Sequence, residues 1–130
     1  MLDTDVVIAA LDRGDAHHRE AAKAIAGMLE DDDQLLLSTI NYAEALVRPA
    51  EESRTLQVAV DAIAALGIRP VAPTAAIARD AARIRSLGVS LADGFALATA
   101  QASSATIASF DRRVRRAMAE LGLDGPRRLR

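Results

Sequence analysis

Four acidic residues, widely separated in the sequence, stand where their side chains could share one site: Asp3, Glu44, Asp93 and Asp111. Asp3 and Asp111 each end a short strand-like segment, whereas Glu44 lies in an apolar helical segment and Asp93 begins another. Two carboxylates ~4 Å apart repel each other by about 4 kcal/mol at an effective dielectric constant near 20. Several of them in one cleft would therefore require protons or a cation, and Mg²⁺ and Mn²⁺ are hard cations that prefer oxygen ligands.

Each of these acids also has a structural explanation. An aspartate between a strand and a helix is a favoured N-cap, and negative charge in a first helical turn is stabilised by the helix dipole. Capping accounts for Asp3, Asp93 and Asp111 when they are taken one at a time. Glu44, among apolar neighbours, is explained instead by a solvated helix face. Considered singly, the residues leave both interpretations open.

Strand-like and helical segments alternate along the chain. Strands are expected at residues 2–4, 35–38, 68–71 and 105–109, with a last short strand at Arg128–Arg130. Helices are expected at residues 6–11, 15–29, 41–47, 56–66, 73–87, 93–102 and 112–121. The alternation predicts an α/β domain with a short-stranded parallel sheet covered by helices on both faces. Ligands bind beyond the carboxyl ends of the strands in such sheets, and Asp3 and Asp111 stand at such ends.

The composition is typical of one domain that folds without disulfides. Its 130 residues contain no cysteine, and no apolar run approaches the ~20 residues of a membrane span, so we expect a cytoplasmic protein. The three aromatic residues, Tyr42, Phe95 and Phe110, are too few for a surface that stacks successive bases. His17 and His18 are adjacent and would point in different directions from a helix, so we expect structural or surface roles for them.

Charge is unevenly distributed along the chain. Residues 1–111 carry 9 basic and 16 acidic side chains, whereas residues 112–130 carry 7 arginines and two acids. Cations in a first helical turn oppose the helix dipole, so local stability does not explain the arginines that follow Asp111. Four arginines are candidates for binding a polyanion or an acidic partner, with a solvated face as the alternative: Arg48, Arg112, Arg115 and Arg116.

In order and spacing, the acids resemble the motifs of the PIN-domain family of metal-dependent ribonucleases, in particular VapC-type toxins. The first motif is a strand ending in Asp-Thr, here Leu2-Asp3-Thr4. The second is a Ser followed six residues later by the Glu of an Ala-Glu pair, here Ser38 and Ala43-Glu44. The third is Leu-x-Asp before an Ala-rich helix, here Leu91-Ala92-Asp93, and the fourth is Ser-x-Asp at a strand end, here Ser109-Phe110-Asp111. One such motif is a weak indication, but four in order are fairly specific.

The resemblance implies a three-layer α/β/α PIN-like domain over residues 1–130, and an endoribonuclease that acts as the toxin of a type II toxin–antitoxin pair. It implies that the four acids bind Mg²⁺ or Mn²⁺, with Thr4 and Ser109 as supporting hydroxyls, and that metal-activated water hydrolyses the RNA phosphodiester. It further implies a homodimer and a cognate antitoxin that blocks the acidic cleft. The four arginines would contact RNA or the antitoxin.

Two features differ from the family pattern. Only two residues precede Asp3, where the family has a longer strand, and Asp5 stands where many relatives carry a neutral side chain. Two other functions fit the same motifs: a catalytically inactive PIN-like module that binds protein, and a nuclease that cuts DNA or flap structures. A dehalogenase-type phosphatase, which residues 3–7 also resemble, is disfavoured because it needs a downstream lysine and the only lysine is Lys23.

Overall fold

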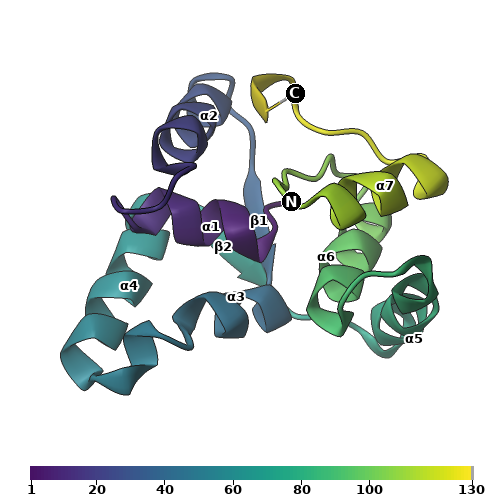
Figure 1. Cartoon of the computed structure of the whole chain (residues 1–130), viewed down its shortest axis with the longest axis horizontal. Helices are drawn as coiled ribbons and strands as arrows, with labels where there is room; N and C mark the ends of the chain where they lie inside the picture. The colour runs from purple at the N-terminus through teal and green to yellow at the C-terminus, as the bar shows by residue number, and fades with distance from the viewer. Residues whose placement is uncertain (130) are drawn as a thin grey trace.

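The computed structural model describes residues 1–129, in which helices alternate with short strands (Figure 1). The α-helices are α1 (Thr4–Leu11), α2 (His18–Glu30), α3 (Thr39–Leu46), α4 (Ser53–Ala65), α5 (Ala75–Ile84), α6 (Leu91–Ala102) and α7 (Arg112–Leu121). The strands are β1 (Leu35–Ser38) and β2 (Ile68–Val71), and turns of 3₁₀ helix occur at η1 (Pro49–Glu51), η2 (Arg85–Leu87) and η3 (Arg127–Leu129). Within residues 1–129, none of the helices combines the length and the apolar character needed to cross a membrane.

Four short segments form the centre of the molecule. β1 and β2 pair in parallel over four residues each. On the other side of β1, the N–H of Leu2 donates to the carbonyl of Leu36 at 2.8 Å, and Leu2 forms a parallel bridge with Ala108. The spatial order is therefore Ala108, Leu2, β1 and β2. The first strand expected from the sequence is thus present only as a single bridge.

Successive residues of the central segments face opposite layers. Leu35 and Leu37 belong to an apolar core shared with α1, α2, α3 and α4, whereas Leu36 packs against a second core built with α5, α6 and α7. The same alternation places Ala108 in the first core and Ile107 in the second. Side chains that alternate in this way bury both faces of a sheet. The three-layer α/β/α arrangement expected from the sequence is confirmed.

Side-chain caps explain where three helices begin. Helices α1, α3 and α6 each start two residues earlier than predicted, because Asp3, Ser38 and Ser90 cap them. The prediction of a last strand at Arg128–Arg130 was wrong for the residues described. The N–H of Leu129 donates to the carbonyl of Pro126 and closes a 3₁₀ turn, while Arg130 lies outside the described residues.

Candidate active site

Asp3 lies at the carboxyl end of the segment that contains Leu2, and the residue is only 2% exposed. One carboxylate oxygen accepts the N–H of Thr4 at 2.9 Å, and the other accepts the hydroxyl of Ser109 at 2.7 Å. Burial raises the pKa of Asp3 to about 7, and the nearby charges of Asp5 and Asp93 act in the same direction. These charges act on Asp3 because the three carboxylates lie close together.

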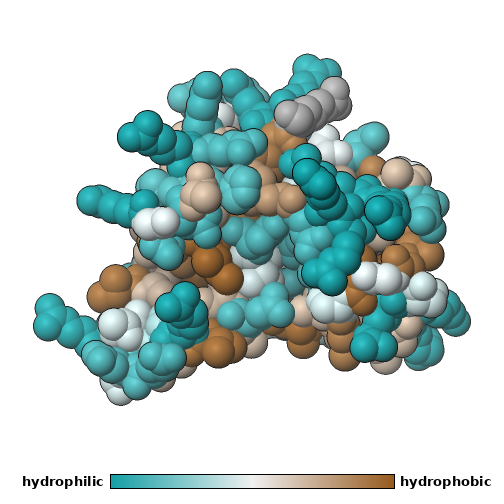
Figure 2. Space-filling view, viewed as in Figure 1, coloured by the Kyte–Doolittle hydropathy of each residue, from teal (hydrophilic) through white to brown (hydrophobic). Residues whose placement is uncertain are grey.

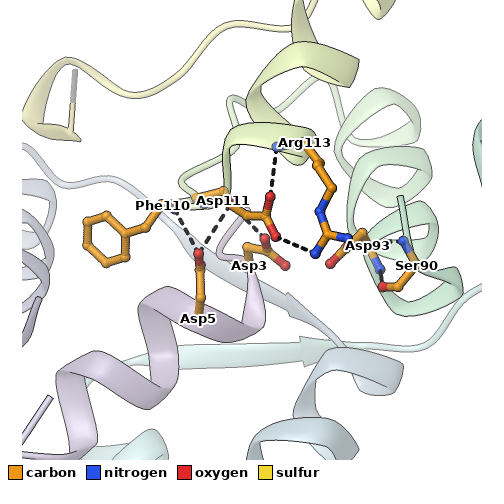
Figure 3. Close-up of polar contacts among 8 residues, drawn as sticks. Asp3, Asp5, Ser90, Asp93, Phe110, Asp111 and Arg113 are labelled. Carbon is orange, nitrogen blue, oxygen red and sulfur yellow. Dashed lines mark hydrogen bonds and ion pairs between the residues drawn. The ribbon is translucent and has the colours of Figure 1, made fainter. Parts of the chain in front are cut away.

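Asp5 holds the segment Ser109–Asp111 against α1. Its Oδ2 accepts the N–H of Phe110 at 2.8 Å and lies 3.4 Å from the Ser109 hydroxyl. Burial raises the pKa of Asp5, although hydrogen bonds from the Phe110 segment oppose the shift. Among the described residues, its Oδ1 is buried without a hydrogen-bond partner. Asp5 therefore belongs to one acidic cluster with Asp3, Asp93 and Asp111 (Figure 3).

Asp93 and Asp111 both cap helices, as the structural explanation predicted. Oδ2 of Asp93 accepts the N–H of Ser90 at 3.1 Å, and the Ser90 hydroxyl accepts the N–H of Asp93, which completes a capping box at α6. Oδ1 of Asp111 accepts the N–H of Arg113 at 2.7 Å at the start of α7. Each cap takes one oxygen of its carboxylate. Capping and metal binding therefore do not exclude each other at these positions.

Arg113 makes a second contact with Asp111. Its Nη2 lies 3.3 Å from Oδ2 of Asp111, and the Arg113 side chain is 70% exposed against 30% for Asp111. Burial by itself would raise the pKa of Asp111, but the hydrogen bonds and the charge of Arg113 outweigh it and lower the pKa. Figure 3 shows the Arg113 side chain reaching from α7 to Asp111. In this structure, an arginine of the chain itself thus neutralises one acid of the cluster.

Glu44 is exposed on α3, and no hydrogen bond or ion pair within residues 1–129 joins it to the acidic cluster. A buried neighbour, Asn41, links α3 to the site instead. Its Nδ2 donates to the Thr4 hydroxyl at 3.0 Å and to the carbonyl of Ala92 at 3.2 Å. These bonds connect α3 to α1, which Asp3 caps, and to α6, which begins two residues before Asp93. The structure thus brings Asp3, Asp93 and Asp111 together and leaves Glu44 outside the contacts of the cluster.

The acidic cluster provides oxygen donors of the kind that Mg²⁺ and Mn²⁺ prefer. Within residues 1–129, no three acidic or histidine side chains converge closely enough to enclose a metal ion in the present arrangement. The chemistry of the donors nevertheless fits a cation, because burial and like charges hold the pKa of Asp3 near 7 and because Oδ1 of Asp5 is buried without a partner among these residues. A divalent cation would relieve both conditions.

The arginines predicted to contact a polyanion lie on the surface. Arg112, Arg115 and Arg116 are exposed on α7, and Arg48 is exposed beside η1. Arg115 also has a structural contact, because its Nε donates to the carbonyl of Ser109 at 2.8 Å. Figure 2 shows hydrophilic side chains gathered over α7 and hydrophobic ones lower on the same face, toward α3 and α4. Helix α7, with its exposed arginines, therefore lies beside the acidic cluster.

Two hollows lie at the amino ends of the central segments, opposite the end that carries the acidic cluster. One has a volume of about 190 Å³ and the other about 460 Å³, and Asp33, Thr106 and Pro126 line both. The amine of Met1 is partly buried there and donates to the carbonyl of Thr106 at 2.8 Å. These hollows contain none of the residues of the acidic cluster.

Asp5, Asn41 and Arg113 are site residues that the sequence did not reveal as such. Asp5 stood out only as a departure from a family pattern, and its position two residues after Asp3, in the first turn of a helix, was the one local signal. Asn41 and Arg113 act through contacts with Thr4 and Asp111 that follow from the tertiary fold and from one local cap. The helical spacing of Arg112, Arg115 and Arg116 indicated a face of α7 other than the one from which Arg113 reaches Asp111.

Comparisons with known proteins agree with this architecture. A PIN domain family model matches residues 1–120. The crystal structure of FitAcB from Neisseria gonorrhoeae is similar in fold, with a TM-score of 0.67 and 22% sequence identity. That alignment covers 98% of this chain and 96% of the other. None of the curated protein sequences matches the chain.

Because the family model covers most of the chain, the protein belongs to the PIN domain family. PIN domains are in general nucleases, which hydrolyse phosphodiester bonds. The likeness to FitAcB shows a shared fold. The acidic cluster described above lies at the carboxyl ends of the central segments.

Proposed function

We propose that the protein is a Mg²⁺- or Mn²⁺-dependent endoribonuclease that acts as the toxin of a type II toxin–antitoxin pair. One observation carries the proposal: Asp3 is a buried acid held beside Asp5 and Asp93 at the carboxyl end of the central segments. Folding disfavours such a grouping unless a cation or protons compensate it. Membership of a family of nucleases and the motif resemblance to VapC-type toxins support the same function.

The proposed ligands are Asp3, Glu44, Asp93 and Asp111. A bound Mg²⁺ or Mn²⁺ would supply charge neutralisation and an acidified water at the scissile phosphate. The Ser109 hydroxyl orients the Asp3 carboxylate, because it donates to Oδ2 at 2.7 Å. The Thr4 hydroxyl accepts from Asn41 and fixes α3, the helix that carries Glu44, against α1.

The proposed partners require free surface, which the structure offers in two forms. Exposed Arg112 and Arg116 give positive charge for RNA beside the acidic cluster. Val47 and Val58 are 66% and 62% exposed and give apolar surface of the kind that a cognate antitoxin or a second copy of the chain would cover. Light scattering of the purified chain, alone and co-expressed with the product of a neighbouring small gene, tests the homodimer and the antitoxin.

The first test is cleavage of RNA by the purified protein with Mn²⁺ or Mg²⁺. We expect EDTA to abolish cleavage and Asp93→Asn to lower its rate by roughly a hundredfold or more, since even groups that only support metal ligands cost about 10–100-fold. The amide oxygen of asparagine can still accept the N–H of Ser90, so this variant should remain folded. Asp61→Asn, at an exposed position on α4, is the matched control and should cleave normally. Full activity in Asp93→Asn would refute the site.

One observation favours a second candidate function, a catalytically inactive module that binds protein. In residues 1–129 no three acids enclose a metal, and Asp93 and Asp111 are already engaged in helix caps. Calorimetric titration with Mn²⁺ separates the two functions. The nuclease should bind Mn²⁺ and lose that binding in Asp3→Asn, whereas the inactive module should show no binding that depends on Asp3. Single-stranded DNA and flap substrates in the cleavage assay distinguish a ribonuclease from a DNA nuclease.

A further inference from the structure

His17 and Phe110 form a stacked pair of rings at the edge of the acidic cluster. Their ring centroids are 4.3 Å apart and the planes are inclined by 13°. Phe110 is the residue directly before Asp111, and its backbone N–H is bound by Asp5. The close-up shows the Phe110 ring pointing to one side of Asp111, while Arg113 reaches Asp111 from the other side (Figure 3). The aromatic pair and the arginine therefore flank the acids.

The stack is not needed to hold the turn that carries His17. Asp15 accepts the N–H of His17 at 2.8 Å, and Asp12 accepts the N–H of Gly14 at 2.8 Å. Nδ1 of His18 is 2.8 Å from the carbonyl of Ala9, which anchors the start of α2 to α1. These bonds fix the connection between α1 and α2 through other residues. The backbone thus positions the His17 ring, and the ring itself is available to contact a ligand.

One side of the His17 ring remains open. Its side chain is 54% exposed although Phe110 covers one face, and the only charged neighbour with which it pairs in the described chain is Glu20, at 3.6 Å. A rigid aromatic plane with a solvent-exposed face provides contact area at little cost in conformational entropy. Bases of single-stranded RNA are recognised by stacking on aromatic side chains, histidine among them.

We propose that the His17–Phe110 pair binds one unpaired base of the RNA strand next to the phosphate that lies over the acidic cluster; this inference rests on the proposed ribonuclease function. The base stacks on the open face of His17 and extends the pair to three rings. Because the chain has only three aromatic residues, the surface holds a single base and does not track a strand. The contact therefore gives a base preference at one position, with purines favoured by their larger stacking area.

The test measures RNA binding without metal or cleavage. Full-length Asp93→Asn in EDTA is titrated into fluorescein-labelled hexamers of adenosine, of uridine and of abasic ribose phosphate, and anisotropy is recorded. Adding His17→Ala should weaken binding of the adenosine hexamer by about 5- to 150-fold, the equivalent of about 1–3 kcal/mol of base stacking. Its affinity for the abasic hexamer should be unchanged. His17→Phe, which keeps an aromatic plane, should bind adenosine as the parent does.

Two controls make the outcome decisive. Gln101→Ala, exposed at the far end of α6, should bind as the parent does, and thermal melting should show that the His17 variants are folded. Equal adenosine binding with and without His17, or an equal loss on the abasic hexamer, overturns the base contact. If the wild type cleaves RNA with Mn²⁺ while His17→Ala keeps the same affinity and base preference, only this inference fails. If no RNA is bound or cut, both it and the proposed function fail.

Discussion

At the scale of single residues, Asp3 is placed where an ionised carboxylate is poorly stabilised. It accepts hydrogen bonds from Thr4 and Ser109, but no basic side chain within residues 1–129 forms an ion pair with it. Burial, and then the charges of Asp5 and Asp93, raise its pKa to about 7. Between pH 3.8 and about 7, the folded chain therefore holds a proton at Asp3 that the unfolded chain releases.

This difference predicts how the stability of the metal-free protein depends on pH. An acid with a raised folded-state pKa contributes stability that is complete below the unfolded value of 3.8 and is lost as the pH rises through about 7. The loss is up to about 4 kcal/mol over the whole range at 1.36 kcal/mol per pKa unit, and about 3 kcal/mol of it falls between pH 5 and pH 8. Urea unfolding at pH 5 and pH 8 in EDTA should show that the wild type loses more stability than Asp3→Asn. Burial lowers the pKa of the Met1 amine to about 6, which makes stability rise with pH. Comparing the two proteins cancels this contribution, because both contain Met1. Parallel pH profiles would contradict the assignment.

Arg113 gives a second prediction at this scale. Its guanidinium pairs with Asp111 and would compete with a metal for that carboxylate. Arg113→Gln should therefore bind Mn²⁺ more tightly, by up to about fivefold, because an exposed ion pair contributes roughly 0.2–1 kcal/mol. Calorimetry at pH 8 measures the change. Arg116→Gln removes a charge from the same helix without a contact to Asp111, so an equal gain in both variants would show a general charge effect instead.

At the scale of elements, α5 and α6 pack so closely that Gly94 has no room for a side chain. A Cβ there would lie 2.7 Å from the carbonyl oxygen of Ala81, a backbone atom that cannot rotate away. Gly94→Ala should therefore destabilise the fold by about 1–3 kcal/mol, although alanine has the better helix propensity. Thermal unfolding measures the effect. Gly27→Ala is the matched control within a helix, because the atoms its Cβ would meet belong to the flexible side chain of Arg128. An equal loss in both variants would contradict the packing argument.

Much of the order of elements followed from the sequence, because the helices carry apolar positions at helical spacing and β1 is a short apolar run. α7 was predicted with its observed ends, since Asp111 and Gly122 are local start and stop signals. The start of α6 was missed, because Asp93 was taken as the first helical residue when it is the third and closes a capping box that Ser90 opens. The prediction of a last strand was wrong, because nothing in the local sequence indicates that the N–H of Leu129 donates to the carbonyl of Pro126 and closes a turn.

The sequence indicated which separated acids are candidates for the site, but it did not indicate how their side chains are arranged. The sequence motifs contain Asp3 near the start of the chain and Asp93 and Asp111 in its second half. The structure brings these three acids together. The hydrogen bond that the N–H of Phe110 donates to Asp5 joins residues far apart in the sequence and leaves no periodic pattern. The same holds for Asn41, whose bonds to Thr4 and Ala92 exist only after three helices have packed. That Glu44 contributes a ligand remains a prediction.

At the scale of the whole molecule, the fold places opposite charges side by side. Residues 1–111 carry 9 basic and 16 acidic side chains, and residues 112–130 carry 7 arginines and two acids. Folding places α7, with Arg112 and Arg116 exposed, next to the acidic cluster. In the proposed function, an RNA strand binds arginines on α7 while its phosphate faces the acids, so that binding affinity and catalysis depend on different residues.

Salt dependence of RNA binding tests this separation. Each phosphate contact on a single strand contributes about 0.7 to the slope of log affinity against log salt concentration, because counterions are released. Removing Arg112 and Arg116 together by alanine substitution in Asp93→Asn should therefore make the slope shallower by about 1.4 if both bind phosphate. Anisotropy titrations of a labelled RNA hexamer at four salt concentrations measure it. Arg54→Ala, on α4 at the other side of the molecule from α7 in Figure 1, should leave the slope unchanged. A slope that falls equally for Arg54→Ala would mean that net charge, and not the placement of α7 beside the acids, directs RNA to the site.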